Sequence, residues 1–141
     1  MKLNLVRRTA CLLASAALLA SCGGNPEEAG APAGLSITPS AITLNVGASL
    51  ADPEGCGEPG AIYFASEVFI YGGAAPYRLD NTQPGTLILT DRNQNPITEV
   101  GSPGGSFLLW AQPDGGCLNP GQVVIVDTTN RLVTLTVTIA Q

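Results

Sequence analysis

Six side chains that could do chemistry gather in two short segments of the chain. They are Asp52, Glu54, Cys56, Glu58, Asp114 and Cys117. Paired carboxylates can act as acid and base in glycoside hydrolysis, and clustered carboxylate oxygens can hold calcium. Because no Asp-x-Asp ligand spacing occurs here, we interpret the four carboxylates as solvated loop charges and predict no metal site. Calcium binding is the alternative.

The residue types that are missing narrow the chemistry further. The chain has no histidine, and Lys2 is its only lysine. The usual general base at neutral pH and the amine that forms Schiff bases are therefore absent, and no serine can be activated by histidine. These absences favour binding or structure, so we predict no enzymatic activity and no cofactor.

Charge is distributed unevenly along the sequence. Three of its six basic residues are Lys2, Arg7 and Arg8. From residue 22 onward, three arginines stand against eleven carboxylates, which leaves a formal net charge of −8. Phosphate binding needs clustered cations, so we expect no nucleic-acid partner.

Residues 1–21 have the layout of a cleaved export signal, with a basic start, an apolar run and small residues before Cys22. The segment Leu19-Ala20-Ser21-Cys22 resembles the lipobox of bacterial lipoproteins. That resemblance implies a diacylglyceryl group on the Cys22 thiol and cleavage before Cys22. Gly23 in the next position resembles lipoproteins that are sorted to the outer membrane. The alternatives are an ordinary secretion signal with an incidental cysteine and, from Arg7-Arg8, a twin-arginine signal.

Residues 22–34 form the lipidated cysteine and a linker rich in Gly, Ala and Pro, without apolar periodicity. Residues 35–141 then have the size of one domain that can bury its own core. We expect strands at residues 35–37, 42–46, 62–71, 77–79, 86–90, 97–100, 107–110, 123–126 and 132–139. The last of these alternates apolar residues with threonine, which is typical of a half-buried antiparallel strand. Several short strands separated by Gly or Pro predict a sandwich or barrel.

Residues 68–77, Val-Phe-Ile-Tyr-Gly-Gly-Ala-Ala-Pro-Tyr, resemble the strand, Gly-Gly turn and Pro-Tyr strand of bacterial immunoglobulin-like domains. Residues 37–47 resemble the opening of that family, and residues 124–127 resemble its penultimate strand. The chain departs from the family at Asn130, where Gly is usual, and at Ala74-Ala75, where Thr-Pro is commoner. The resemblance covers residues 35–141. It implies an all-β, immunoglobulin-like antiparallel β-sandwich of about seven to nine strands.

The two cysteines that remain after processing are Cys56 and Cys117. In an immunoglobulin-like sandwich the loops that carry them emerge at the same end, so we predict a disulfide between them. Such a bond would close a loop of about 62 residues and stabilise the fold by about 4 kcal/mol. Zinc is the alternative, but two thiolates without histidine fall short of four ligands.

Alternation within two expected strands predicts which side chains face the core. The residues expected to point inward are Ile62, Phe64, Val68, Ile70, Phe107 and Leu109. Tyr63 would then point outward. Because the two strands are neighbours in one sheet of this fold, their other outward side chains would form an aromatic patch. This patch consists of Phe69, Tyr71, Leu108 and Trp110.

An exposed apolar patch on a monomer marks an interaction surface. Its partner would be a protein or a glycan. Alternatively, a bulge or a one-residue shift in register would turn these side chains into the core, or a loop would cover them.

We therefore predict a non-enzymatic lipoprotein of the bacterial cell envelope, held in the outer membrane by its lipid and acting in interaction or structure. One alternative is a glycan-binding module built on the aromatic patch. Another is a protease inhibitor, because residues 101–105 faintly resemble a Gly-rich inhibitory loop. The Asn-Pro-Thr-Thr-Gly loop of chagasin-like inhibitors is, however, missing from residues 72–76.

Overall fold

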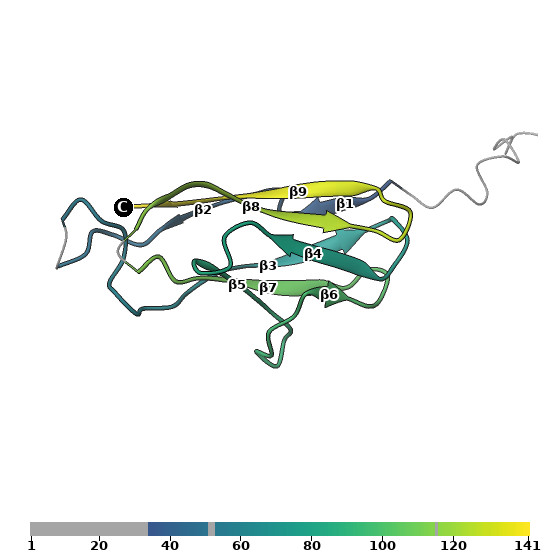
Figure 1. The fold of residues 1–141 in the computed structure, drawn as a ribbon, viewed down its shortest axis with the longest axis horizontal. Helices are drawn as coiled ribbons and strands as arrows, with labels where there is room; N and C mark the ends of the chain where they lie inside the picture. The colour runs from purple at the N-terminus through teal and green to yellow at the C-terminus, as the bar shows by residue number, and fades with distance from the viewer. Residues whose placement is uncertain (1–33, 51–52, 115) are drawn as a thin grey trace, which may run out of the picture. The chain divides into compact units, whose positions relative to one another are not determined.

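The computed structural model describes residues 34–50, 53–114 and 116–141, which form two β-sheets packed face to face (Figure 1). The strands are β1 Ser36–Thr38, β2 Ala41–Asn45, β3 Tyr63–Tyr71, β4 Tyr77–Asn81, β5 Leu87–Thr90, β6 Glu99–Val100, β7 Ser106–Ala111, β8 Leu118–Val126 and β9 Leu132–Ala140. One sheet has the order β1-β3-β7-β5 and the other β2-β9-β8-β4-β6. Across these ranges no helix is long and apolar enough to span a membrane.

The predicted all-β class is confirmed, and each expected strand is present. Strand β9 shows why the prediction succeeds, because Leu135, Val137 and Ile139 are fully buried while the intervening threonines lie on the outer surface. Asn130 lies in the turn between β8 and β9 with a φ of 60°, a left-handed conformation that asparagine tolerates. The predicted signal peptide 1–21, Cys22 and all of the predicted linker 22–34 except Gly34 lie outside the described residues.

One strand pair departs from the antiparallel arrangement that we expected. Strand β2 runs parallel to β9, with Ala41 opposite Thr136. Strands β1 and β2 belong to different sheets but are separated only by Pro39 and Ser40. The chain therefore passes from one sheet to the other without turning back.

Both flanks of the sandwich are bridged by the chain. On one flank, β1 and β2 cross between the sheets within ten residues. On the other, the Ile97 amide donates to the Leu89 carbonyl of β5 at 3.0 Å, and the Leu79 amide of β4 donates to the Thr98 carbonyl at 2.8 Å. These two hydrogen bonds occupy backbone groups of β5 and β4 that would otherwise be open to pairing with another strand. The broad outer faces of the sheets are left as the accessible surfaces.

The core lies between the sheets and is built from the inward side chains of both. The largest fully buried ones are Tyr77, Phe107, Ile70, Leu87, Leu109, Ile125, Leu135 and Ile139. Tyr77 has its ring in the core and donates its hydroxyl to the Gly72 carbonyl at 2.6 Å. This bond satisfies the one polar atom of the buried ring, as is usual for tyrosine.

Candidate functional site

A β-bulge in β3 decides which side chains reach the outer face of the four-stranded sheet. The pairing of β3 with β7 shifts between Phe64 and Ser66, so the extra residue reverses the alternation on its N-terminal side. Our prediction that Ile62 and Phe64 point into the core is therefore wrong, since they are 57% and 52% exposed. Tyr63 also departs from our prediction, because it lies opposite the buried Ala111 rather than on the outer face.

On the C-terminal side of the bulge the predicted alternation holds. Val68 and Ile70 are fully buried, and so are Phe107 and Leu109 on β7. The four residues of the predicted patch lie on the opposite, outer side of these strands: Phe69, Tyr71, Leu108 and Trp110. Tyr71 is 49% exposed and the other three are half-buried.

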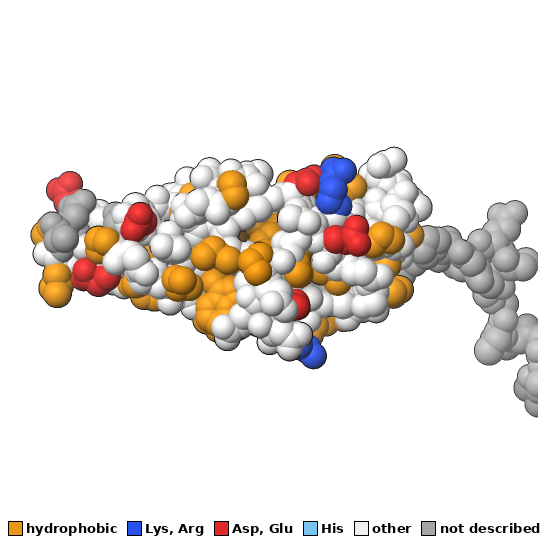
Figure 2. All heavy atoms as spheres, turned by 60° about the horizontal axis from the view of Figure 1, so that its bottom comes forward, with side chains coloured by type: hydrophobic (Ala, Val, Ile, Leu, Met, Phe, Trp, Pro, Cys, Tyr) orange, Lys and Arg blue, Asp and Glu red, His pale blue; other side chains and the backbone are white. Residues whose placement is uncertain are grey.

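Trp110 lies at the centre of a row of outer side chains that crosses three strands. It is paired with Phe64 on β3 and with Ile88 on β5. The Phe64 and Trp110 rings meet edge to face, with centroids 5.1 Å apart. The Trp110 Nε1–H donates to Thr90 Oγ1 at 2.9 Å, which fixes the orientation of the indole. Figure 2 shows apolar side chains gathered over the middle of the face that is turned forward.

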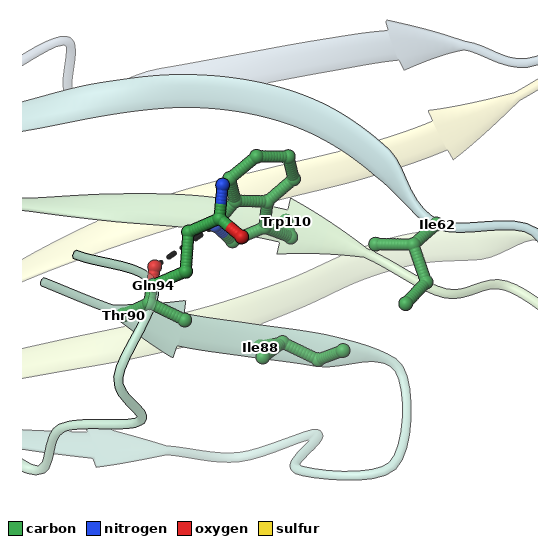
Figure 3. Close-up of a pocket in the computed structure, with 5 residues that line it drawn as sticks. All are labelled: Ile62, Ile88, Thr90, Gln94 and Trp110. Atoms are coloured by element: carbon green, nitrogen blue, oxygen red, sulfur yellow. Dashed lines mark hydrogen bonds between the residues drawn. The ribbon is translucent and has the colours of Figure 1, made fainter. Parts of the chain in front are cut away.

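A hollow of about 220 Å³ opens beside this row (Figure 3). Its lining consists of Ile62, Ile88, Thr90, Gln94 and Trp110. Two of these residues, Ile62 and Ile88, are added to the outer face by features that our prediction did not include. The bulge exposes Ile62, and β5, which we expected as a strand without predicting its neighbour, brings Ile88 opposite Trp110.

The loop between β5 and β6 forms one wall of the hollow. The Asp91 carboxylate accepts hydrogen bonds from the Asn93 and Asn95 amides at 2.8 and 2.9 Å and from the Asn95 side chain at 3.1 Å. These hydrogen bonds lower the pKa of Asp91, and the bond from the Asn95 side chain has the largest effect. They hold Gln94 at a φ of 64°, within the tip of a compact turn.

The charges on this face are paired. Glu67 on β3 accepts hydrogen bonds from Ser106 Oγ at 2.6 Å and from Arg92 Nη2 at 2.7 Å. The Ser106 bond, followed by those from Arg92, lowers the pKa of Glu67. The hydrogen-bonded cluster of Glu67, Ser106 and Arg92 separates the predicted patch into two parts along β3. Trp110 belongs to the hollow, whereas Phe69 and Tyr71 lie beyond Glu67, toward Gly72.

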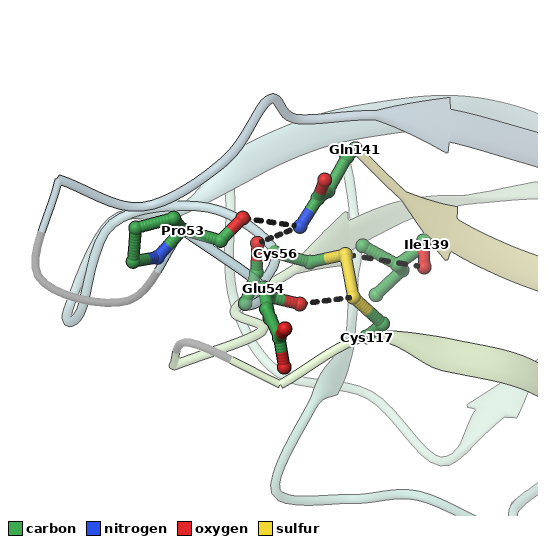
Figure 4. The surroundings of a disulfide bond; sticks show 7 residues. Pro53, Glu54, Cys56, Cys117, Ile139 and Gln141 are labelled. Carbon is green, nitrogen blue, oxygen red and sulfur yellow. Dashed lines mark hydrogen bonds between the residues drawn. A yellow bond between two sulfur atoms is a disulfide. The ribbon is translucent and has the colours of Figure 1, made fainter.

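At one end of the sandwich, Cys56 and Cys117 form the expected disulfide, with Cα atoms 4.9 Å apart (Figure 4). Neither cysteine lies in a strand, also as expected. Cys56 is fully buried. The Gln141 side-chain amide donates to the Pro53 and Gly55 carbonyls, both at 2.9 Å, and so ties the end of β9 to the same loop.

Two of the four carboxylates at this end, which we interpreted as solvated loop charges, also accept backbone hydrogen bonds. Glu58 accepts the Leu50 amide at 2.7 Å, and Asp114 accepts the Gly60 amide at 3.0 Å. Each carboxylate thereby fastens a loop. Asp52 lies outside the described residues, and within the described ranges no three His, Cys, Asp or Glu side chains are grouped as metal ligands.

At the opposite end, Asp127 has a role that we did not predict from the sequence. Its buried carboxylate accepts the Ala74 amide at 3.0 Å, the Thr129 amide and hydroxyl, and the Arg131 amide and guanidinium. Burial raises the pKa of Asp127, but the hydrogen bonds from Thr129, Arg131 and Ala74 outweigh it and hold the pKa well below the ordinary value. The role of Asp127 is therefore to join the β8–β9 turn to the β3–β4 connection.

Comparisons of the chain with protein-family models, curated proteins and solved structures found no match. The apolar hollow and the carboxylate-fastened disulfide end are thus the two features on which a function can be based. The disulfide end is internally bonded. The hollow, in contrast, presents an aromatic ring and an amide to solvent.

Proposed function

We propose that the chain is a non-enzymatic lipoprotein of the bacterial cell envelope, which binds a partner through the outer face of its β1-β3-β7-β5 sheet. The lipobox at residues 19–22 and the linker at residues 23–34 support the anchored location. The diacylglyceryl group on Cys22 carries two acyl chains and, with a further acyl group on the amine, would hold the protein permanently in the membrane. Gly23 favours the outer membrane.

An immunoglobulin-like fold is part of this proposal. In that fold one sheet has the order A-B-E-D and the other contains C, F and G as neighbours. Strands β1-β3-β7-β5 follow the first order, and β9-β8-β4 follow the second. The short strand β6, which follows β5 in the chain yet pairs with β4, is an addition to that scheme.

The point at which the chain enters the sandwich lies at the end opposite the disulfide loop. The chain enters the sandwich at Ser36, which pairs with Tyr71 at the C-terminal end of β3. The disulfide loop contacts the other end of β3, because the Glu58 amide donates to the Tyr63 hydroxyl at 3.1 Å. A nine-residue strand spans about 26 Å at about 3.3 Å per residue. These two ends of the sandwich are therefore about 26 Å apart.

The observation that carries the binding role is the exposed aromatic row. Phe64 is half exposed beside Trp110, although the interior of a sandwich offers burial to such rings. Contiguous apolar surface of this kind marks an interaction site on a soluble domain. Aromatic rings contribute strongly to binding because they bury a large area with little loss of conformational freedom.

A photo-crosslinking experiment in growing cells tests this role. A photoreactive amino acid replaces either Phe64, on the outer face, or Thr136, on the exposed face of the other sheet. We expect a discrete crosslinked product from position 64 and none from position 136. Equal products at both positions, or none at position 64, would contradict the proposed binding face.

The anchor has its own test. The full chain, expressed in bacteria with a labelled palmitate precursor, should incorporate label and fractionate with membranes. The Cys22→Ala variant should lose the label. If it kept the label, or if the wild-type chain incorporated none, the lipid attachment at Cys22 would be wrong.

A further inference from the structure

We propose that the hollow beside Trp110 binds one neutral sugar ring of an oligosaccharide. This inference rests on the proposed function, because it names the class of partner for the same outer face. The site would use three parts: the indole of Trp110, the apolar floor of Ile62 and Ile88, and the amide of Gln94 (Figure 3).

The indole is presented as a fixed platform. Its Nε1–H is held by Thr90 Oγ1, and its edge contact with Phe64 limits rotation. A sugar ring has an apolar C–H face and a rim of hydroxyl groups. An aromatic ring can bury the C–H face while the hydroxyl groups keep their hydrogen bonds to water or to other polar groups. Because the indole is oriented before binding, less conformational freedom is lost when the sugar is bound.

Gln94 provides the polar contact that a sugar hydroxyl requires. Its side-chain amide has no hydrogen-bond partner in the described parts of the chain, although the loop around it is extensively bonded. A carboxamide offers two N–H donors and a carbonyl acceptor, which suits hydroxyl groups that both donate and accept. The hydrogen-bonded turn around it places Gln94 in the lining of the hollow.

The lining also favours a neutral ligand. None of the five lining residues carries a charge. Glu67 and Arg92, on the same face, neutralise each other at 2.7 Å. An anionic ligand would find no unpaired cation in the lining, and a quaternary ammonium would lack both a carboxylate and an enclosing set of rings. The volume of about 220 Å³ is smaller than the usual 300–1,000 Å³ of drug-sized sites and fits a single ring.

The chain carries its own reporter for this site, since Trp110 is its only tryptophan. The full chain, in a detergent without a sugar head group, is titrated with hexasaccharides of glucose and of N-acetylglucosamine in α and β linkages. Tetramethylammonium and inorganic phosphate are titrated in parallel. We expect a saturable change in Trp110 emission with at least one neutral hexasaccharide and none with the two ions.

Two variants complete the test. Gln94→Gly removes the amide while accepting the positive φ, so it should weaken sugar binding about tenfold without altering the fold. Gln122→Ala removes a glutamine from the exposed face of the other sheet and should leave binding unchanged. Equal affinity in wild type and Gln94→Gly would overturn the assignment.

A flat titration with every neutral hexasaccharide, or a response to either ion instead, would also overturn the sugar proposal. The crosslinking experiment then decides whether the proposed function fails as well. If position 64 still gives a discrete crosslinked product in cells, the outer face binds a partner that is not a sugar. If that product is absent as well, both proposals fail.

Discussion

Opening the Cys56–Cys117 bond should lower the stability of the domain by about 4 kcal/mol. The bond joins residues 61 positions apart. Closing such a loop removes about 14 cal/mol/K of entropy from the unfolded chain, which is about 4 kcal/mol at about 25 °C. A domain of about 107 residues unfolds with an entropy of about 0.22 kcal/mol/K. The expected fall in Tm is therefore about 18 °C.

The Cys117→Ala variant isolates this effect, because Cys117 is exposed whereas Cys56 is fully buried. Thermal unfolding of the full chain, followed by circular dichroism, compares wild type, Cys117→Ala and the Cys56→Ala/Cys117→Ala double variant. The double variant should melt lower still, because it also loses the packing of the buried Cys56 side chain. A fall in Tm of less than about 5 °C for Cys117→Ala would refute the loop-entropy reasoning.

Three further substitutions test the fold. Asp127→Asn should be less stable than wild type at neutral pH. Because the folded pKa of Asp127 is lowered, its contribution is present above about pH 4 and is lost as the pH falls. Urea unfolding at several pH values should therefore show a smaller loss of stability on acidification in Asp127→Asn than in wild type, where Asp127 adds to the contributions of Glu67 and Asp91. Leu109→Ala should cost about 2–5 kcal/mol in urea unfolding, and more than Trp110→Ala on the outer face of the same strand. Gly73→Ala should lower Tm, because the φ is 67° and the new Cβ would lie 2.9 Å from the Leu35 side chain.

Elements whose pattern depends on one buried face could be predicted from the sequence. In β9 every second residue enters the core, so the apolar and threonine positions specify both the strand and its orientation. The left-handed turn at Asn130 follows from local preferences of the side chain. The disulfide required more than local pattern, because its two cysteines approach each other only when the sheets are assembled.

The outer face could be predicted only in part. Leu108 and Trp110 follow the regular alternation of β7, whereas Phe64 lies before a bulge that the amino-acid pattern does not reveal. Such a bulge arises from the pairing of two strands, and one extra residue reverses every side chain before it.

Polar contacts between residues far apart in the chain could not be predicted from the local sequence for the same reason. Asp127 accepts an amide from Ala74, 53 residues away, so its burial depends on how the two sheets meet. Gln94 reaches the hollow because the β5–β6 loop folds back beside Trp110. In both cases the residue type was visible in the sequence, but its partner was set by the tertiary structure.

Whether the outer face is occupied in the envelope can be measured directly at Trp110. Labelling the full chain with 5-fluorotryptophan gives one fluorine signal from the single tryptophan. Unlabelled envelope fragments from cells that lack the protein are then added. We predict that the chemical shift of this signal changes, and that Phe64→Ser, which removes the neighbouring ring, makes this change smaller. An unchanged chemical shift in protein that sediments with the fragments would contradict the account.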